Sequence, residues 1–104
     1  MTHYPLTKLA LVLALMITGE SHAVEQQALY TQSLAATCAN CHGTLGVAQP
    51  GMESLAGVPK DDLQKKLMDF KNGRKPATLM HQISKGYTDE QLEQLAGYFA
   101  ALKK

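Results

Sequence analysis

The chain has 104 residues, of which 10 are Lys or Arg and 9 are Asp or Glu, so its formal net charge is +1. This length holds one small domain at most. The near balance of charge argues against a protein whose main task is to neutralise a nucleic-acid backbone, and a hydrophobic content of 45% argues against a disordered chain.

Residues 1–23 are predicted to be a cleaved secretory signal peptide. A free amine and Lys8 precede nine apolar residues (9–17), and a polar stretch then ends in small residues with the cut after Ala23. A membrane anchor is the alternative, but nine apolar residues are about half of the roughly 20 that span a bilayer. The mature protein would then be residues 24–104, a single domain in the periplasm.

Helices joined by Gly and Pro loops are predicted for the rest of the chain. The first helix should run from Glu25 to about Ala39, and the Gly- and Pro-rich segment 43–59 should be a loop. A loop of this length in a compact domain is usually functional.

A second helix should begin with Pro59 at its first position, present one apolar stripe, and end at Asn72-Gly73. The stripe residues are Leu63, Leu67 and Phe70.

A short helix or helical turn is expected over 77–84. The last helix should start at Thr88, which with Gln91 forms a capping box; its stripe is Leu92, Leu95, Ala96, Phe99 and Leu102. Since no segment alternates as a strand does, the predicted class is all-α, with three main helices and short helical turns.

The chemistry of the chain lies in the sequence Cys38-Ala39-Asn40-Cys41-His42. Two thiols at i and i+3 on a helix point the same way and match the two vinyl groups on one side of a haem, while His42 supplies an imidazole to the iron. A thioredoxin-like redox pair would need a preceding strand, and a zinc site would need a fourth ligand, for which the mature chain has no further cysteine. One covalent haem c on Cys38 and Cys41 is therefore the predicted cofactor.

The second axial ligand should be Met80. The other candidates are Met52, in the loop close to His42 in sequence; Met68, which looks like a core filler; and His81. In a helical turn, Leu79, Met80 and Ile83 share a face, whereas His81 points away from it and should be a solvated surface residue. A His/Met pair raises the reduction potential and closes the iron to substrates, so electron transfer is favoured over catalysis.

Three segments carry a resemblance to a known family: CANCHG, ESLAG and DFKNGRKPATLMHQISKGYTDEQLEQLAGYFA. The chain resembles the class I bacterial c-type cytochromes, and among them the cytochrome subunit of flavocytochrome c sulfide dehydrogenase. The resemblance implies a class I fold wrapped around one haem, with Cys38 and Cys41 attached and His42 and Met80 as axial ligands. It also implies a non-catalytic haem subunit that accepts electrons from a sulfide-oxidising FAD flavoprotein.

The chain departs from this family pattern at residue 53, where the family usually has proline and this chain has Glu53. In the family that proline commonly offers its carbonyl to the proximal histidine. A carbonyl from another residue could serve here, but the rigidity of proline is lost, and Glu53 can bring a charge near the haem. Arg74 and Lys75 are candidates to meet a haem propionate. Two further functions stay open: a free-standing periplasmic shuttle with several partners, and, more distantly, a haem sensor or peroxidase that releases Met80.

Overall fold

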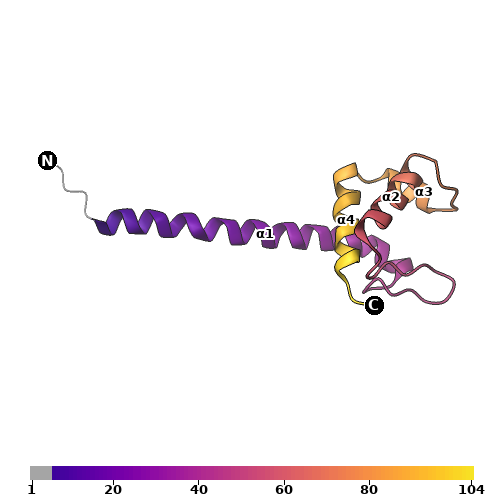
Figure 1. The fold of residues 1–104 in the computed structure, drawn as a ribbon, viewed down its shortest axis with the longest axis horizontal. Helices are drawn as coiled ribbons and strands as arrows, with labels where there is room; N and C mark the ends of the chain where they lie inside the picture. The colour runs from indigo at the N-terminus through magenta and orange to yellow at the C-terminus, as the bar shows by residue number, and fades with distance from the viewer. Residues whose placement is uncertain (1–5) are drawn as a thin grey trace. The chain divides into compact units, whose positions relative to one another are not determined.

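The computed structural model describes residues 6–104, and their side chains from residue 20 onward. The chain divides into two units, Met1–Tyr30 and Thr31–Lys104, and helix α1 (Leu6–His42) contributes residues to both (Figure 1). Residues 1–5 of the predicted signal peptide lie outside the described part, and its cleavage remains a prediction. None of the helices in the described part combines the length and hydropathy of a membrane span.

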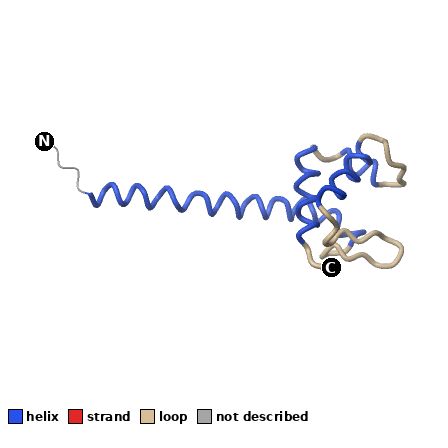
Figure 2. Tube along the Cα trace, in the orientation of Figure 1, coloured by secondary structure: helices blue, strands red, loops and turns tan. Residues whose placement is uncertain are grey.

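The described residues form helices and loops without a strand, which confirms the all-α prediction (Figure 2). After α1, the second unit contains α2 (Lys60–Lys71), α3 (Met80–Lys85) and α4 (Asp89–Ala101). The predicted pattern of three main helices and one short helical turn is therefore present. All structural statements below concern this second unit.

The first helix extends beyond its predicted end at Ala39 and includes Cys41 and His42. It stops at Gly43, whose φ of +89° lies in the left-handed region and whose N–H donates to the Ala39 carbonyl at 3.0 Å. A Cβ at residue 43 would lie 2.0 Å from the carbonyl oxygen of Val47. Only glycine fits this turn, which sends the chain back beneath the last turn of α1.

The core of the second unit lies where α2 and α4 pack together, with Ala35 of α1 added to it. Four of the five predicted stripe residues are buried in α4, whereas the fifth, Leu102, is the half-buried C-cap. The capping box at the start of α4 forms, with the Thr88 hydroxyl accepting from the Gln91 N–H at 3.1 Å. Pro59 is the N-cap of α2, one residue before the predicted position. The buried apolar residues of the core cluster are Ala35, Leu63, Leu92, Leu95, Ala96 and Phe99.

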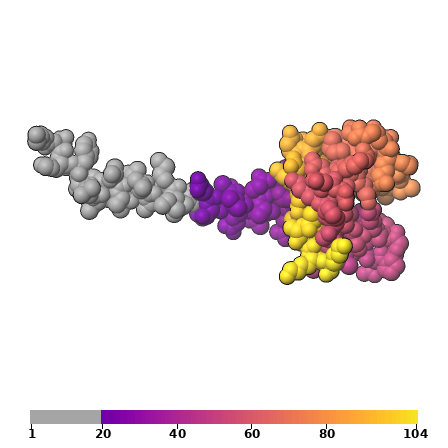
Figure 3. All heavy atoms as spheres, in the orientation of Figure 1, coloured from indigo at the N-terminus to yellow at the C-terminus, as the bar shows by residue number. Residues whose placement is uncertain are grey.

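The short helix α3 begins at Met80, three residues later than predicted. Its first turn closes on the carbonyl of Leu79, which accepts from the N–H groups of Gln82 and Ile83 at 2.9 and 3.0 Å. Residues 77–79 therefore remain in the connection from α2, and Gly86 caps the other end. Figure 3 shows this connection in orange and the 43–59 loop in magenta on the surface of the unit.

Asp69 holds the connection that leads to Met80. Its carboxylate accepts hydrogen bonds from Lys65 at 2.6 Å and Arg74 at 2.9 Å, and its carbonyl accepts the Arg74 N–H at 2.8 Å. The hydrogen bonds from Lys65 and Arg74 hold the pKa of Asp69 below its ordinary value of 3.8. This carboxylate therefore contributes stability above that ordinary pKa, and the contribution is lost as the pH falls through the lower folded pKa.

We expect Asp69→Asn to lower the urea midpoint of unfolding at pH 7, with the gap to the wild type closing as the pH falls below 3.8. Urea titrations at pH 7 and pH 3 measure both quantities. Asp61→Asn, which changes an exposed acid at the other end of α2, is the matched control and should change the midpoint less. A gap that stays constant between the two pH values would contradict the proposed charge-assisted bonds.

Candidate functional site

A cavity of about 390 Å³ lies among the four helices of the second unit and the 43–59 loop. This volume lies in the usual range for sites that hold small molecules and cofactors. The wall is mostly apolar, and its large side chains include Leu55, Leu63, Leu67, Phe70, Leu95 and Phe99. Such a wall suits a mostly hydrophobic ligand that makes polar contacts at only a few points.

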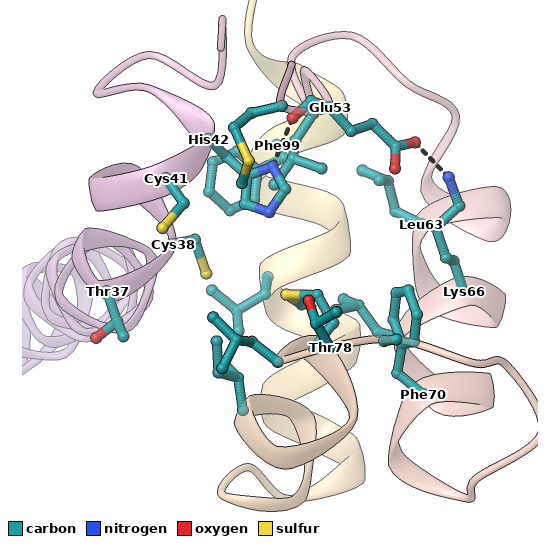
Figure 4. A pocket seen from close by; sticks show the side chains of 18 of the residues that line it. Thr37, Cys38, Cys41, His42, Glu53, Leu63, Lys66, Phe70, Thr78 and Phe99 are labelled. Atoms are coloured by element: carbon teal, nitrogen blue, oxygen red, sulfur yellow. Dashed lines mark hydrogen bonds and ion pairs between the residues drawn. The ribbon is translucent and has the colours of Figure 1, made fainter. Parts of the chain in front are cut away.

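Cys38 and Cys41 lie in the last turns of α1 and both line the cavity (Figure 4). Both thiols are free, and burial raises the pKa of the Cys38 thiol above its ordinary value. A redox-active CxxC pair instead lowers the pKa of its nucleophile, and a helix rather than a strand precedes this motif. The described residues also contain no group of three or more His, Cys, Asp or Glu side chains suited to a metal ion. This geometry fits neither the thioredoxin-like alternative nor the zinc alternative.

His42, the last residue of α1, is buried at one end of the cavity, with 9% of its surface exposed. Its Nδ1 donates a hydrogen bond of 2.5 Å to the backbone carbonyl of Glu53. Because a carbonyl only accepts, the hydrogen of the neutral ring must be on Nδ1, which leaves a lone pair on Nε2. The imidazole is thus held in the tautomer that a metal ligand needs.

The carbonyl that the family pattern assigns to proline is therefore supplied by Glu53 itself. The Glu53 carboxylate is not merely solvated, because it forms an ion pair with Lys66 of α2 (Figure 4). Both residues line the cavity. The expected charge near the site is thus present, but it is paired.

Met80, Leu79 and Ile83 all line the cavity, as the helical face predicted. Met52 also lines it from the loop, while Met68 packs against the core cluster, as a core filler should. In the view of Figure 4, Thr78 of the same connection lies across the cavity from His42. The cavity therefore has an imidazole from α1 and two thioethers in its wall.

The prediction that His81 is a solvated surface residue is wrong. His81 is half-buried, and its Nδ1 is buried without a hydrogen-bond partner in the described part of the chain. Helical position alone would leave this side chain in water, so its burial comes from the fold around α3. His81 is nevertheless absent from the cavity wall, as its helical position predicted.

Lys66 contributes a cation to the cavity wall and was not among the site residues predicted from the sequence. Arg74 instead bonds to Asp69, and the Lys75 ammonium lies 5.8 Å from the centre of the Phe70 ring. The signal for Lys66 was its position in α2, three residues after Leu63 and four before Phe70. That spacing places it on the buried face of the helix.

These residues fit a haem by their donor chemistry. Two sulfurs one helical turn apart face an apolar cavity, an imidazole presents a bare Nε2, and thioethers are available as soft second ligands. Lys66 adds one cation to the wall, where the Glu53 carboxylate pairs with it.

Similarity to known proteins agrees with a haem site, although no family model matches the chain. It is 39% identical over 71 residues to the cytochrome subunit of sulfide dehydrogenase of Chlorobaculum tepidum, covering 68% of this chain and 64% of that protein. It is 30% identical to cytochrome c-553 of Helicobacter pylori, covering 88% of this chain and 96% of that protein. The solved structure of Acidithiobacillus ferrooxidans cytochrome c4 matches with a TM-score of 0.64 at 32% identity, covering 77% of this chain and 49% of that one.

The chain thus spans less than two thirds of the sulfide dehydrogenase subunit and about half of cytochrome c4. It covers cytochrome c-553 almost from end to end. That match, together with the helical fold shared with cytochrome c4, shows that the chain belongs to the class I cytochromes c, a family of haem-containing electron-transfer proteins.

Proposed function

We propose that the chain binds one haem c, attached through Cys38 and Cys41, with His42 and Met80 as axial ligands. It transfers single electrons in the periplasm after removal of residues 1–23. The observation that carries this proposal is the hydrogen bond from His42 Nδ1 to the Glu53 carbonyl, because it frees Nε2 toward a cavity that both cysteines line.

The bound haem supplies a one-electron couple between ferric and ferrous iron. The residues of the chain set the conditions for it. His42, oriented by Glu53, would bind the iron through a nitrogen of raised basicity, while the Met80 thioether would favour the ferrous state. The mostly apolar wall would favour the less charged state of the site. With His42 and Met80 both bound to the iron, no position would be left for a substrate, as expected of a carrier.

A sulfide-oxidising FAD flavoprotein is the proposed electron donor. Similarity to the cytochrome subunit of sulfide dehydrogenase supports this choice. Oxidation of HS⁻ to elemental sulfur releases two electrons and one proton, whereas one haem accepts a single electron. The flavin would hold the electron pair and pass it on one electron at a time, so two copies of this chain are reduced for each sulfide oxidised.

A free-standing shuttle with several redox partners is the second candidate. The similarity to a cytochrome c-553 favours it, because that similarity extends over 96% of that protein. Co-purification from the native periplasm separates the two candidates: a permanent subunit leaves with its flavoprotein, and a shuttle leaves alone.

The purified, flavin-free protein should not turn over sulfide catalytically, because its iron has no vacant position and its thiols are consumed by haem attachment. Adding a sulfide-oxidising flavoprotein should give rapid reduction, with two haems reduced per sulfide, measured by the visible spectrum under anaerobic conditions. Slow stoichiometric reduction by sulfide alone is compatible with the proposal. Rapid multiple turnover without flavin would reject it.

A further inference from the structure

Glu53 is bound from two sides. Its backbone carbonyl accepts the hydrogen bond from His42, and its carboxylate pairs with Lys66. Figure 4 shows the two interactions in series, from the imidazole through Glu53 to the ammonium on α2. Because carbonyl and carboxylate belong to one residue, the ion pair limits the positions that the backbone of Glu53 can take.

The loop that carries Glu53 is tied mainly to itself. The Ala48 N–H donates to Ser54 Oγ at 2.8 Å, and the Leu55 N–H donates to the Gly46 carbonyl at 2.8 Å. Two residues before Glu53, Gly51 lies at φ +94° with open space around it. Lys66, by contrast, belongs to a regular helix that packs into the core. The ion pair thus connects a glycine-containing loop to helix α2, which is packed into the core.

We infer that Lys66 is a positioning residue for His42, which acts by holding Glu53 so that its carbonyl stays aligned with Nδ1. The inference rests on the proposed role of His42 as an axial ligand. An imidazole bound to a metal is oriented, and made more basic, by the acceptor of its other N–H. Lys66 therefore takes part in setting the properties of the iron without touching it.

The expected size of the positioning effect follows from the solvent exposure of the Lys66 and Glu53 side chains. The Lys66 side chain is 31% exposed and that of Glu53 is 53% exposed, so the pair is partly screened by water. A pair of this kind changes a local equilibrium by up to about fivefold. The pair should therefore affect how often the His42 hydrogen bond opens and leave the fold intact.

A positioning role and a purely electrostatic role predict different signs for the effects of substituting Lys66 and Glu53. Lys66→Met removes a positive charge and Glu53→Gln removes a negative charge, so a through-space effect shifts the reduction potential in opposite directions. Loss of positioning instead increases opening of the same hydrogen bond in both variants. The exchange of the His42 Nδ1 hydrogen with solvent reports that opening directly.

The test uses the secreted, haem-loaded protein in its reduced state, with exchange of the Nδ1 hydrogen followed by NMR. Lys66→Met and Glu53→Gln should each accelerate exchange by about two- to fivefold, and the double variant should be no faster than either, because the two residues form one link. Reversing the pair, with Glu53→Lys and Lys66→Glu together, should restore most of the protection. Lys65→Met, which removes a neighbouring charge paired with Asp69, is the control and should exchange like the wild type.

Each result bears on a separate claim. Wild-type exchange in haem-loaded Lys66→Met and Glu53→Gln would overturn the positioning role and leave the proposed function standing. Equal acceleration in Lys65→Met would also overturn it, since net charge alone would then be responsible. A wild-type protein without covalent haem, or one whose His42 does not bind the iron, would overturn the proposed function first.

Discussion

Replacing Met80 by alanine is expected to open the iron to external ligands. The six-coordinate low-spin spectrum should be lost, the affinity for imidazole or cyanide should rise by at least about tenfold, and the reduction potential should fall by roughly 0.1–0.2 V within the ~0.8 V span set by axial ligands. Visible spectroscopy with ligand titration, and a redox titration, measure these changes.

Met52 and His81 are the matched controls for this variant. Met52 lines the same cavity but directly precedes Glu53, whose carbonyl contacts His42. Met52 is therefore placed next to the proposed ligand His42 and not opposite it. His81 is half-buried and absent from the cavity wall. Met52→Ala and His81→Ala should both keep the low-spin spectrum. A larger spectral change in either control than in Met80→Ala would assign the second ligand differently.

Removing both attachment sulfurs should have the second large effect. Wild-type protein should keep its haem in denaturing electrophoresis, because thioether bonds survive denaturation. Cys38→Ala and Cys41→Ala should each retain one bond, whereas the double variant should release all of its haem into acidified organic solvent. Haem staining of the gel, together with extraction, gives the bound fraction.

The double variant should also be much less stable. A domain of this size buries a modest core, and small chains of this kind usually depend on a covalent or cofactor staple. Circular dichroism should show loss of helix at temperatures where the wild type remains folded. Full extraction of haem from the wild type would contradict covalent attachment, and retention of haem by the double variant would place the bonds elsewhere.

The features that the sequence predicted well depend on residues close together in the chain. The capping box of Thr88 and Gln91 spans three residues, and both cysteines fall on one side of α1 because a helical turn fixes their spacing. Glycine at residue 43 likewise stops α1 at a definite place, although the helix continues past its expected end at Ala39.

The features that it missed depend on how separate helices pack. His81 was expected in water because its own helix gives no sign of what covers it, yet the folded chain leaves it half-buried. Lys66 was not predicted as a site residue, since lysine side chains rarely line an apolar wall. Its partner Glu53 lies 13 residues away, on a loop whose path is set by hydrogen bonds that no local pattern indicates.

The turn at Gly43 has a consequence for the order in which the haem site is assembled. His42 and Glu53 are 11 residues apart, so the loop that Gly43 reverses can close on the imidazole as a local event, and loops of about ten residues close in roughly 10–100 ns. Met80 follows His42 by 38 residues and reaches the cavity only after α2 and α3 have packed. Closing that longer loop costs about 1 kcal/mol more in chain entropy. We therefore expect the half of the site that contains the cysteines and the histidine to form first, and the methionine half to close over it last.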